Sequence, residues 1–203
     1  MTATPSQTPT VTVTPTHTLP PGPTITPTFD YPNVTVIKQA NCRYGPGTAY
    51  LYRWGLYPGD QAEVHGRNWS GTWFWIKPEN LDSHCWASEI VFEIRGDAMS
   101  VPVITPLLPK TTFAGPPGNV QAVREGSQVV VTWDPVILSD DKRRGYLLEV
   151  SVCQNGLRVP MIVHTDDTRY DFLDETDCEG ESSGLLYTAE KHGYSDPVQI
   201  PWP

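Results

Sequence analysis

The residues of this sequence that could carry catalysis are few, and their spacing argues against it. A cysteine nucleophile needs a histidine base close to it in space, and these two residue types are neighbours at His84-Cys85. On an extended strand, adjacent side chains point to opposite faces, so His84 could not deprotonate Cys85. The sequence also has no nucleophile elbow, phosphate-binding loop, H-E-x-x-H motif or dinucleotide fingerprint. We therefore predict that the chain is not an enzyme.

Metal binding is the second chemistry to weigh. Cys42, His65, His84 and Cys85 offer zinc-type ligands, but the divergence of His84 and Cys85 leaves a tetrahedral set poorly supported. An acidic run near the C-terminus lacks the spacing and the fixed glycine of a calcium-binding loop. Its members are Asp166, Asp167, Asp171, Asp174, Glu175, Asp177, Glu179 and Glu181. We expect a solvated acidic face there, and we predict neither a metal nor another cofactor.

Aromatic residues are better candidates for function. Tyr50, Tyr52 and Trp54 recur with a period of two, which on a strand places them on one face. With Tyr44 and Trp73 they could line a shallow groove that stacks on sugar rings or proline-rich peptides. In the alternative interpretation, Tyr50 and Tyr52 fill a core and Trp54 packs under a linker.

The composition limits what can position these residues. A chain of 203 residues with 21 prolines must contain a part that packs no core. The formal charge of −9 argues against a nucleic-acid or anionic-membrane partner. There is no run of 18 apolar residues, so no membrane-spanning segment is expected. The first ten residues lack the basic and apolar regions of a signal peptide.

The N-terminal residues 1–33 contain eleven threonines and eight prolines with almost no charge. Such a segment cannot bury enough apolar area to offset the entropy of ordering, and it favours extended conformations. We predict a disordered Thr/Pro-rich stalk over 1–33.

Residues 34–96 alternate short β-type runs with turn residues at the spacing of a small barrel. The runs span 34–39, 50–54, 61–65, 72–76 and 85–92. The motif N-x-R-x-G-P-x-T-x-Y, which begins at Asn41 and ends at Tyr50, resembles the opening motif of the bacterial SH3-like (SH3b) domain. Gly59-Asp60, the W-x-W-I run from Trp73 and Cys85-Trp86 match later motifs of that family. The resemblance implies an SH3-like barrel. Because a barrel of about sixty residues needs large side chains to bury area, we expect Trp75 and Trp86 in its core.

A Pro-rich linker is expected over 97–114, packed on one neighbour. Residues 115–203 then show seven longer alternating runs, which is typical of a β-sandwich. P-P-G-N-V-x-A from Pro116, V-x-V-x-W-D-P ending at Pro135, and G-Y-L-L-E-V from Gly145 resemble a fibronectin type III domain. The resemblance implies a core that contains Trp133, Tyr146, Leu148, Val150 and Val152, and it makes Tyr187 a candidate corner tyrosine.

The four cysteines fall two by two into these regions, and none forms a C-x-x-C motif. In the SH3b family the positions of Cys42 and Cys85 are usually a small apolar residue and a glycine, so two departures to cysteine suggest that these side chains meet. We predict the disulfides Cys42–Cys85 and Cys153–Cys178, because cysteine pairs in small exported β domains are usually structural. Four buried, reduced thiols are the alternative.

These expectations combine into an all-β, non-enzymatic protein of the extracellular space or cell surface. The predicted function is binding or adhesion, in which the barrel contacts cell-wall glycan or peptide or another surface protein. The alternative is a structural spacer within a larger exported surface protein or cell-wall enzyme.

Overall fold

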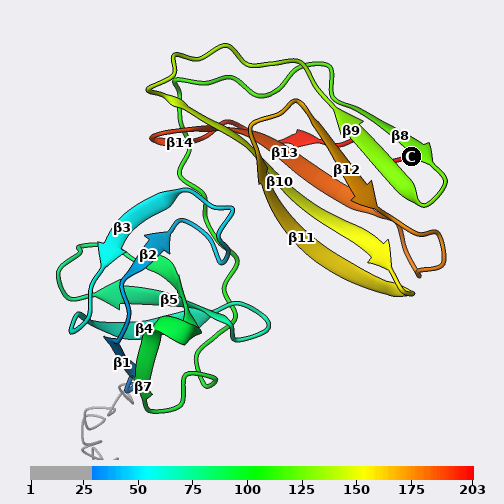
Figure 1. Ribbon diagram of the computed structural model, residues 1–203. Helices are drawn as coiled ribbons and strands as arrows, with labels where there is room; N and C mark the ends of the chain where they lie inside the picture. The colour runs from blue at the N-terminus through cyan, green and yellow to red at the C-terminus, as the bar shows by residue number, and fades with distance from the viewer. Residues whose placement is uncertain (1–28) are drawn as a thin grey trace, which may run out of the picture. The chain divides into compact units, whose positions relative to one another are not determined.

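Short runs of β-branched and aromatic residues, separated by glycine and proline turns, form fifteen strands in three antiparallel sheets. They are seen in the computed structural model, which describes residues 29–203 (Figure 1). The predicted all-β class is confirmed. The predicted stalk over 1–33 lies almost wholly outside the described residues. Within those residues, no helix has the length and hydropathy required to span a bilayer.

The N-terminal sheet has seven strands in the order β3-β2-β6-β5-β4-β1-β7. The strands are β1 (Asn33–Val36), β2 (Ala40–Arg43), β3 (Tyr52–Leu56), β4 (Gln61–Arg67), β5 (Trp73–Pro78), β6 (Cys85–Ser88) and β7 (Phe92–Arg95). Five runs were expected. The last of them is divided by a 3₁₀ turn at Glu89–Val91. The strand β2 was not expected, because Cys42 is its only buried residue and has polar neighbours on both sides. Alternation along β4 buries Ala62 and Val64 in the core of this sheet.

The C-terminal sheets contain eight strands, one more than expected. They are β8 (Gln121–Glu125), β9 (Gln128–Thr132), β10 (Arg143–Gln154), β11 (Leu157–Thr165), β12 (Arg169–Leu173), β13 (Ser183–Glu190), β14 (Gly193–Tyr194) and β15 (Val198–Gln199). One sheet runs β11-β10-β13-β14, with β15 also paired to β13, and the other runs β12-β9-β8. Their shared core contains all five residues expected there, namely Trp133, Tyr146, Leu148, Val150 and Val152.

The Pro-rich segment between the sheets packs on both neighbours rather than on one. Val103 forms a parallel bridge with Arg67 of β4, and Lys110 forms another with Tyr194 of β14. Proline removes donors along this segment, so single bridges replace a continuous strand. Residues 31–203 belong to one compact unit.

Both predicted disulfides are present. Cys42 and Cys85 join β2 to β6 with Cα atoms 5.5 Å apart, and Cys153 and Cys178 are bridged with Cα atoms 5.7 Å apart. Both distances lie in the range that an unstrained backbone allows. Disulfides of this kind persist in oxidising compartments.

Candidate functional site

The position of Tyr50 after the Gly-Pro-Gly turn differs from the one that the period-two pattern predicted. The expected strand over 50–54 begins only at Tyr52, and Tyr50 is turned inward and 2% exposed. A Cβ on Gly45 would lie 2.5 Å from the ring of Tyr50, so the glycine makes room for that ring. The guanidinium of Arg43 donates a 2.6 Å hydrogen bond to the carbonyl of Tyr50 and fixes the backbone there.

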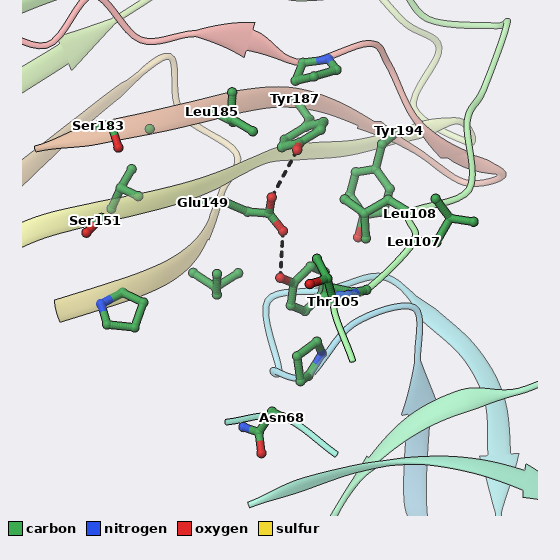
Figure 2. A pocket seen from close by; sticks show the side chains of 18 of the residues that line it. Asn68, Thr105, Leu107, Leu108, Glu149, Ser151, Ser183, Leu185, Tyr187 and Tyr194 are labelled. Carbon is green, nitrogen blue, oxygen red and sulfur yellow. Dashed lines mark hydrogen bonds between the residues drawn. The ribbon is translucent and has the colours of Figure 1, made fainter. Parts of the chain in front are cut away.

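The side chain of Tyr50 points towards the C-terminal sheets, where its hydroxyl is hydrogen-bonded to a carboxylate. Its hydroxyl donates a 2.7 Å hydrogen bond to Oε1 of Glu149 on β10, and Tyr187 on β13 donates a 3.0 Å bond to Oε2. The dashed lines at Glu149 in Figure 2 mark these two bonds. Burial, and then the charge of Glu149, raise the pKa of both tyrosines. The hydroxyl of Tyr187, the candidate corner tyrosine, is thus hydrogen-bonded to a side chain.

An apolar cluster surrounds this contact. Leu147 alternates with the core residues Tyr146 and Leu148 and therefore lies on the outer face of β10, yet it is fully buried. Tyr50 and Tyr194 belong to the cluster that covers it. The hydroxyl of Tyr194 also accepts a 2.7 Å hydrogen bond from the backbone N–H of Leu51. The N-terminal and C-terminal sheets are thus joined by packing and by hydrogen bonds.

Beside this contact lies a groove of about 1200 Å³, which we call the interface groove. The Pro-rich segment forms one wall, and the outer faces of β11 and β13 form the other (Figure 2). The apolar side chains that line it include Leu107, Leu108, Pro109, Pro160, Ile162 and Leu185. Glu149 of β10 lies on the sheet face between Ile162 of β11 and Leu185 of β13. Most of the exposed lining is apolar, with polar side chains such as Ser151, Ser183 and Gln199 among it, as in many ligand sites.

Two large apolar side chains stand at the rim of the interface groove. Trp69, in the turn between β4 and β5, is 86% exposed, and Leu107 in the Pro-rich segment is 93% exposed. The polar, turn-forming neighbours Asn68 and Ser70 are a weak signal that Trp69 lies in a turn rather than in a strand. No pattern singled out Leu107.

The five aromatics predicted to line one groove have different surroundings. Tyr50 lines the interface groove. Tyr52 and Trp54 on β3 are exposed, at 56% and 39%. Tyr44 is partly buried beneath the guanidinium of Arg53, 4.9 Å from its ring centre. Trp73 is partly buried at the start of β5, where its backbone N–H donates a hydrogen bond to Oδ1 of Asn68. A ligand-binding role for the five stays a prediction.

The four residues considered as zinc ligands make other interactions in the structure. Cys42 and Cys85 are bonded to each other, which leaves no thiolate. His65 and His84 do meet, with Nδ1 of His65 2.8 Å from Nε2 of His84, and Glu63 is hydrogen-bonded to the other nitrogen of His65. The ring of His84 stacks on Trp75, 3.8 Å between centres. Trp75, expected in the core, is only partly buried, whereas Trp86 is fully buried.

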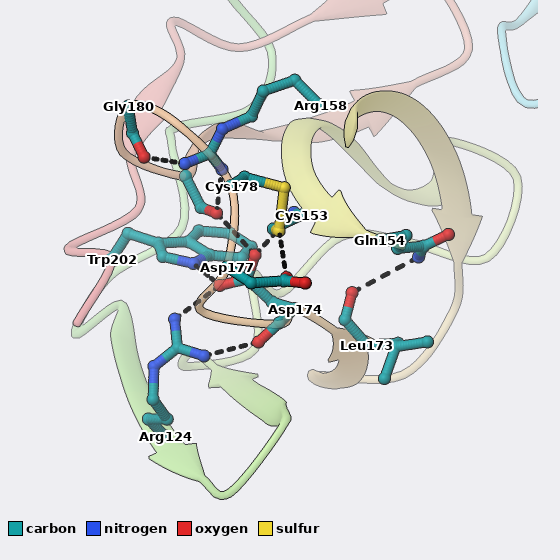
Figure 3. Close-up of polar contacts among 11 residues, drawn as sticks. Arg124, Cys153, Gln154, Arg158, Leu173, Asp174, Asp177, Cys178, Gly180 and Trp202 are labelled. Atoms are coloured by element: carbon teal, nitrogen blue, oxygen red, sulfur yellow. Dashed lines mark hydrogen bonds and ion pairs between the residues drawn. A yellow bond between two sulfur atoms is a disulfide. The ribbon is translucent and has the colours of Figure 1, made fainter. Parts of the chain in front are cut away.

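The acidic run is a solvated face except at one position. Asp174 has no exposed surface, which corrects the expectation for that residue. Its carboxylate accepts hydrogen bonds from Arg124, Ser182, Trp202 and the backbone N–H of Cys153 (Figure 3). Burial alone would raise the pKa of Asp174, but these four bonds outweigh it and lower the pKa to about 2. This carboxylate is therefore a structural hub of the C-terminal sheets.

A cluster beside that hub looks like a metal site but cannot act as one. The sulfur atoms of Cys153 and Cys178 lie close to the carboxylate of Asp177. Because the two sulfurs are bonded to each other, neither is a thiolate ligand. The 3.3 Å approach of Cys153 Sγ to Asp177 is a contact, since a disulfide sulfur has no proton to donate.

No family model matches the chain, and no curated protein matches it.

Proposed function

We propose that this chain is a non-enzymatic binding or adhesion module of the extracellular space or cell surface, and that its ligand enters the interface groove. In this proposal the N-terminal sheet is an SH3b-like barrel and the C-terminal sheets are a fibronectin type III-like sandwich. The partner is cell-wall glycan or peptide or another surface protein. One observation carries the proposal: Trp69 and Leu107 stand almost fully exposed at the rim of an apolar groove.

Exposed apolar side chains at a groove supply binding energy when a partner covers them. Fully burying a leucine-sized side chain stabilises a complex by roughly 1.5–3 kcal/mol, and tryptophan is enriched among the residues that dominate interfaces. Single exposed apolar residues need no explanation, but two at the rim of one apolar groove favour an interaction site. The disulfides support an extracellular location.

The test compares retention of the chain and its variants on insoluble cell-wall glycopeptide and on an immobilised surface-protein fraction. We expect Trp69→Ala and Leu107→Ala to reduce retention on the true ligand by about tenfold, or about 1.4 kcal/mol. Ile137→Ala is the matched control, because Ile137 is 94% exposed and does not line the groove. Equal retention of all four proteins on both materials would rule the proposal out.

The second candidate is a rigid spacer, and a separate observation favours it. Tyr50 and Leu51 of the N-terminal sheet are hydrogen-bonded to Glu149 and Tyr194 of the C-terminal sheets, within an apolar cluster. A spacer needs this contact and no ligand. The retention assay separates the two functions, since a spacer is retained on neither material and loses nothing when Trp69 is replaced.

A further inference from the structure

We infer that the interface groove takes the side chain of a lysine or arginine from an otherwise apolar segment of a partner protein, and that Glu149 anchors this positive charge. The inference rests on the proposed function and names the ligand class for the same groove.

Glu149 is a charge in apolar surroundings without a cationic partner. Its two oxygens accept one hydrogen bond each, from Tyr50 and Tyr187. Each carboxylate oxygen can accept another, so the group still has acceptor capacity. Among the ion pairs of residues 29–203, none involves Glu149.

The other charged residues that line the groove are already paired with each other. Lys110 Nζ lies 2.7 Å from Asp196 Oδ1, and both side chains are 63% exposed. That pair is therefore close to neutral and open to solvent, where its attraction for a ligand is weak. Glu149 is partly exposed between walls of leucine, proline and isoleucine. A positive charge that reaches it is attracted more strongly than at an open surface, because the local dielectric is lower.

The walls favour polypeptide over glycan. Polar side chains such as Ser151, Ser183 and Gln199 belong to the lining, but the neighbours of Glu149 on the two adjacent strands are the apolar residues Ile162 and Leu185. Sugar rings carry hydroxyls around their edges and fit such apolar neighbours less well than apolar side chains do. Apolar side chains and prolines of an extended peptide match such walls. Lysine and arginine also carry apolar stems, which lie along apolar walls while the charged end reaches an acceptor.

The surrounding charge favours the same ligand. Residues 115–203 carry 7 basic and 15 acidic side chains, which is most of the formal charge of −9. A basic segment is therefore drawn towards the C-terminal sheets and an acidic one is repelled.

The experiment selects a displayed random hexapeptide library on the immobilised chain and measures affinities of the enriched peptides by fluorescence polarisation. We expect enriched peptides to place lysine or arginine beside leucine, isoleucine or proline. Replacing that lysine or arginine by norleucine should weaken binding by tenfold or more. Glu149→Gln should remove most of this discrimination, whereas Glu125→Gln, which removes an exposed charge on β8, should leave it intact.

Since Glu149→Gln also alters the contact with Tyr50, Tyr187→Phe is measured beside it. It removes one hydrogen bond to Glu149 but keeps the charge, so the discrimination should survive. Enriched peptides without a basic residue, no enrichment, or discrimination that persists in Glu149→Gln would each overturn the inference. If retention on glycopeptide still depends on Trp69 and Leu107 in such a case, the proposed function stands without this ligand class.

Discussion

The hydroxyl of Tyr50 donates a 2.7 Å hydrogen bond to Oε1 of Glu149, although 99 residues separate them in the sequence. Tyr50 closes the Gly-Pro-Gly turn of the N-terminal sheet, and Glu149 lies on the outer face of β10. The Gly-Pro-Gly turn therefore makes an internal contact with the C-terminal sheets. Tyr50 and Glu149 also line the interface groove.

The first prediction concerns the strength of this bond. Tyr50→Phe should lower the free energy of unfolding by roughly 1.5–3 kcal/mol, because a hydrogen bond to a charged group is lost in a buried place. Denaturant unfolding measures it, and the double variant with Glu149→Gln should cost less than the sum of the single changes. Tyr52→Phe is the control, since Tyr52 is 56% exposed. Additive costs would show that the two side chains are not coupled.

The second prediction is a loss of stability in alkali. Burial, and then Glu149, raise the pKa of Tyr50 and Tyr187 above the ordinary value near 10. Above that pH the folded chain holds more protons than the unfolded chain, so stability is present below about pH 10 and falls as the pH rises further. Unfolding measured from pH 8 to 11 should show this fall, and it should be shallower in Tyr50→Phe. An unchanged slope in that variant would contradict the assignment.

The third prediction compares Gly45 and Gly47, the two glycines of the Gly-Pro-Gly turn. Gly45→Ala would place a methyl group 2.5 Å from the ring of Tyr50, and we expect a cost of about 1–3 kcal/mol as the ring is pushed from its site. In Gly47→Ala the nearest ring atom would be 3.5 Å away, which is ordinary contact. That variant should lie within about 0.5 kcal/mol of the wild type. Thermal unfolding compares the two, and equal costs would count against the role given to Gly45.

Local patterns predicted the all-β class. The core positions of Val150 and Val152 and the pairing of Cys42 with Cys85 were expected from resemblances to two known families, whereas Cys153–Cys178 followed from two cysteines in one small β region. The contact that Tyr50 makes could not be predicted. Tyr50 precedes β3 and does not share a strand face with Tyr52 and Trp54, and no local pattern names the distant residue that it meets. Burial of Asp174 had a usable signal, since it lies two residues after the buried Phe172 and so continues the inward face of β12. No sequence signal marked Leu107, because the exposure of a side chain in a proline-rich segment depends on how the neighbouring sheets pack.

The fourth prediction concerns Asp174 and acid. Its pKa of about 2 lies below the ordinary value near 3.9. The folded chain thus holds fewer protons than the unfolded chain, and about 2 kcal/mol of stability, present above pH 4, should be lost as the pH falls towards 2. Asp174→Asn should cost about 3–5 kcal/mol at pH 7, because Arg124 loses its buried partner.

Asp171→Asn is the control for that change, since its pair with Arg169 is exposed and screened by solvent. Unfolding curves at pH 7 and pH 3 separate the variants. If Asp174→Asn were as mild as Asp171→Asn, the hub assignment would fail.

The central claim is that the N-terminal and C-terminal sheets form one unit through Tyr50, Glu149 and the cluster around them. The most direct measurement is ¹⁵N relaxation of the intact chain, with rotational correlation times obtained separately for amides of β1–β7 and of β8–β15. We predict one shared correlation time in the wild type and two different values in Tyr50→Ala. Two distinct correlation times in the wild type would contradict the claim.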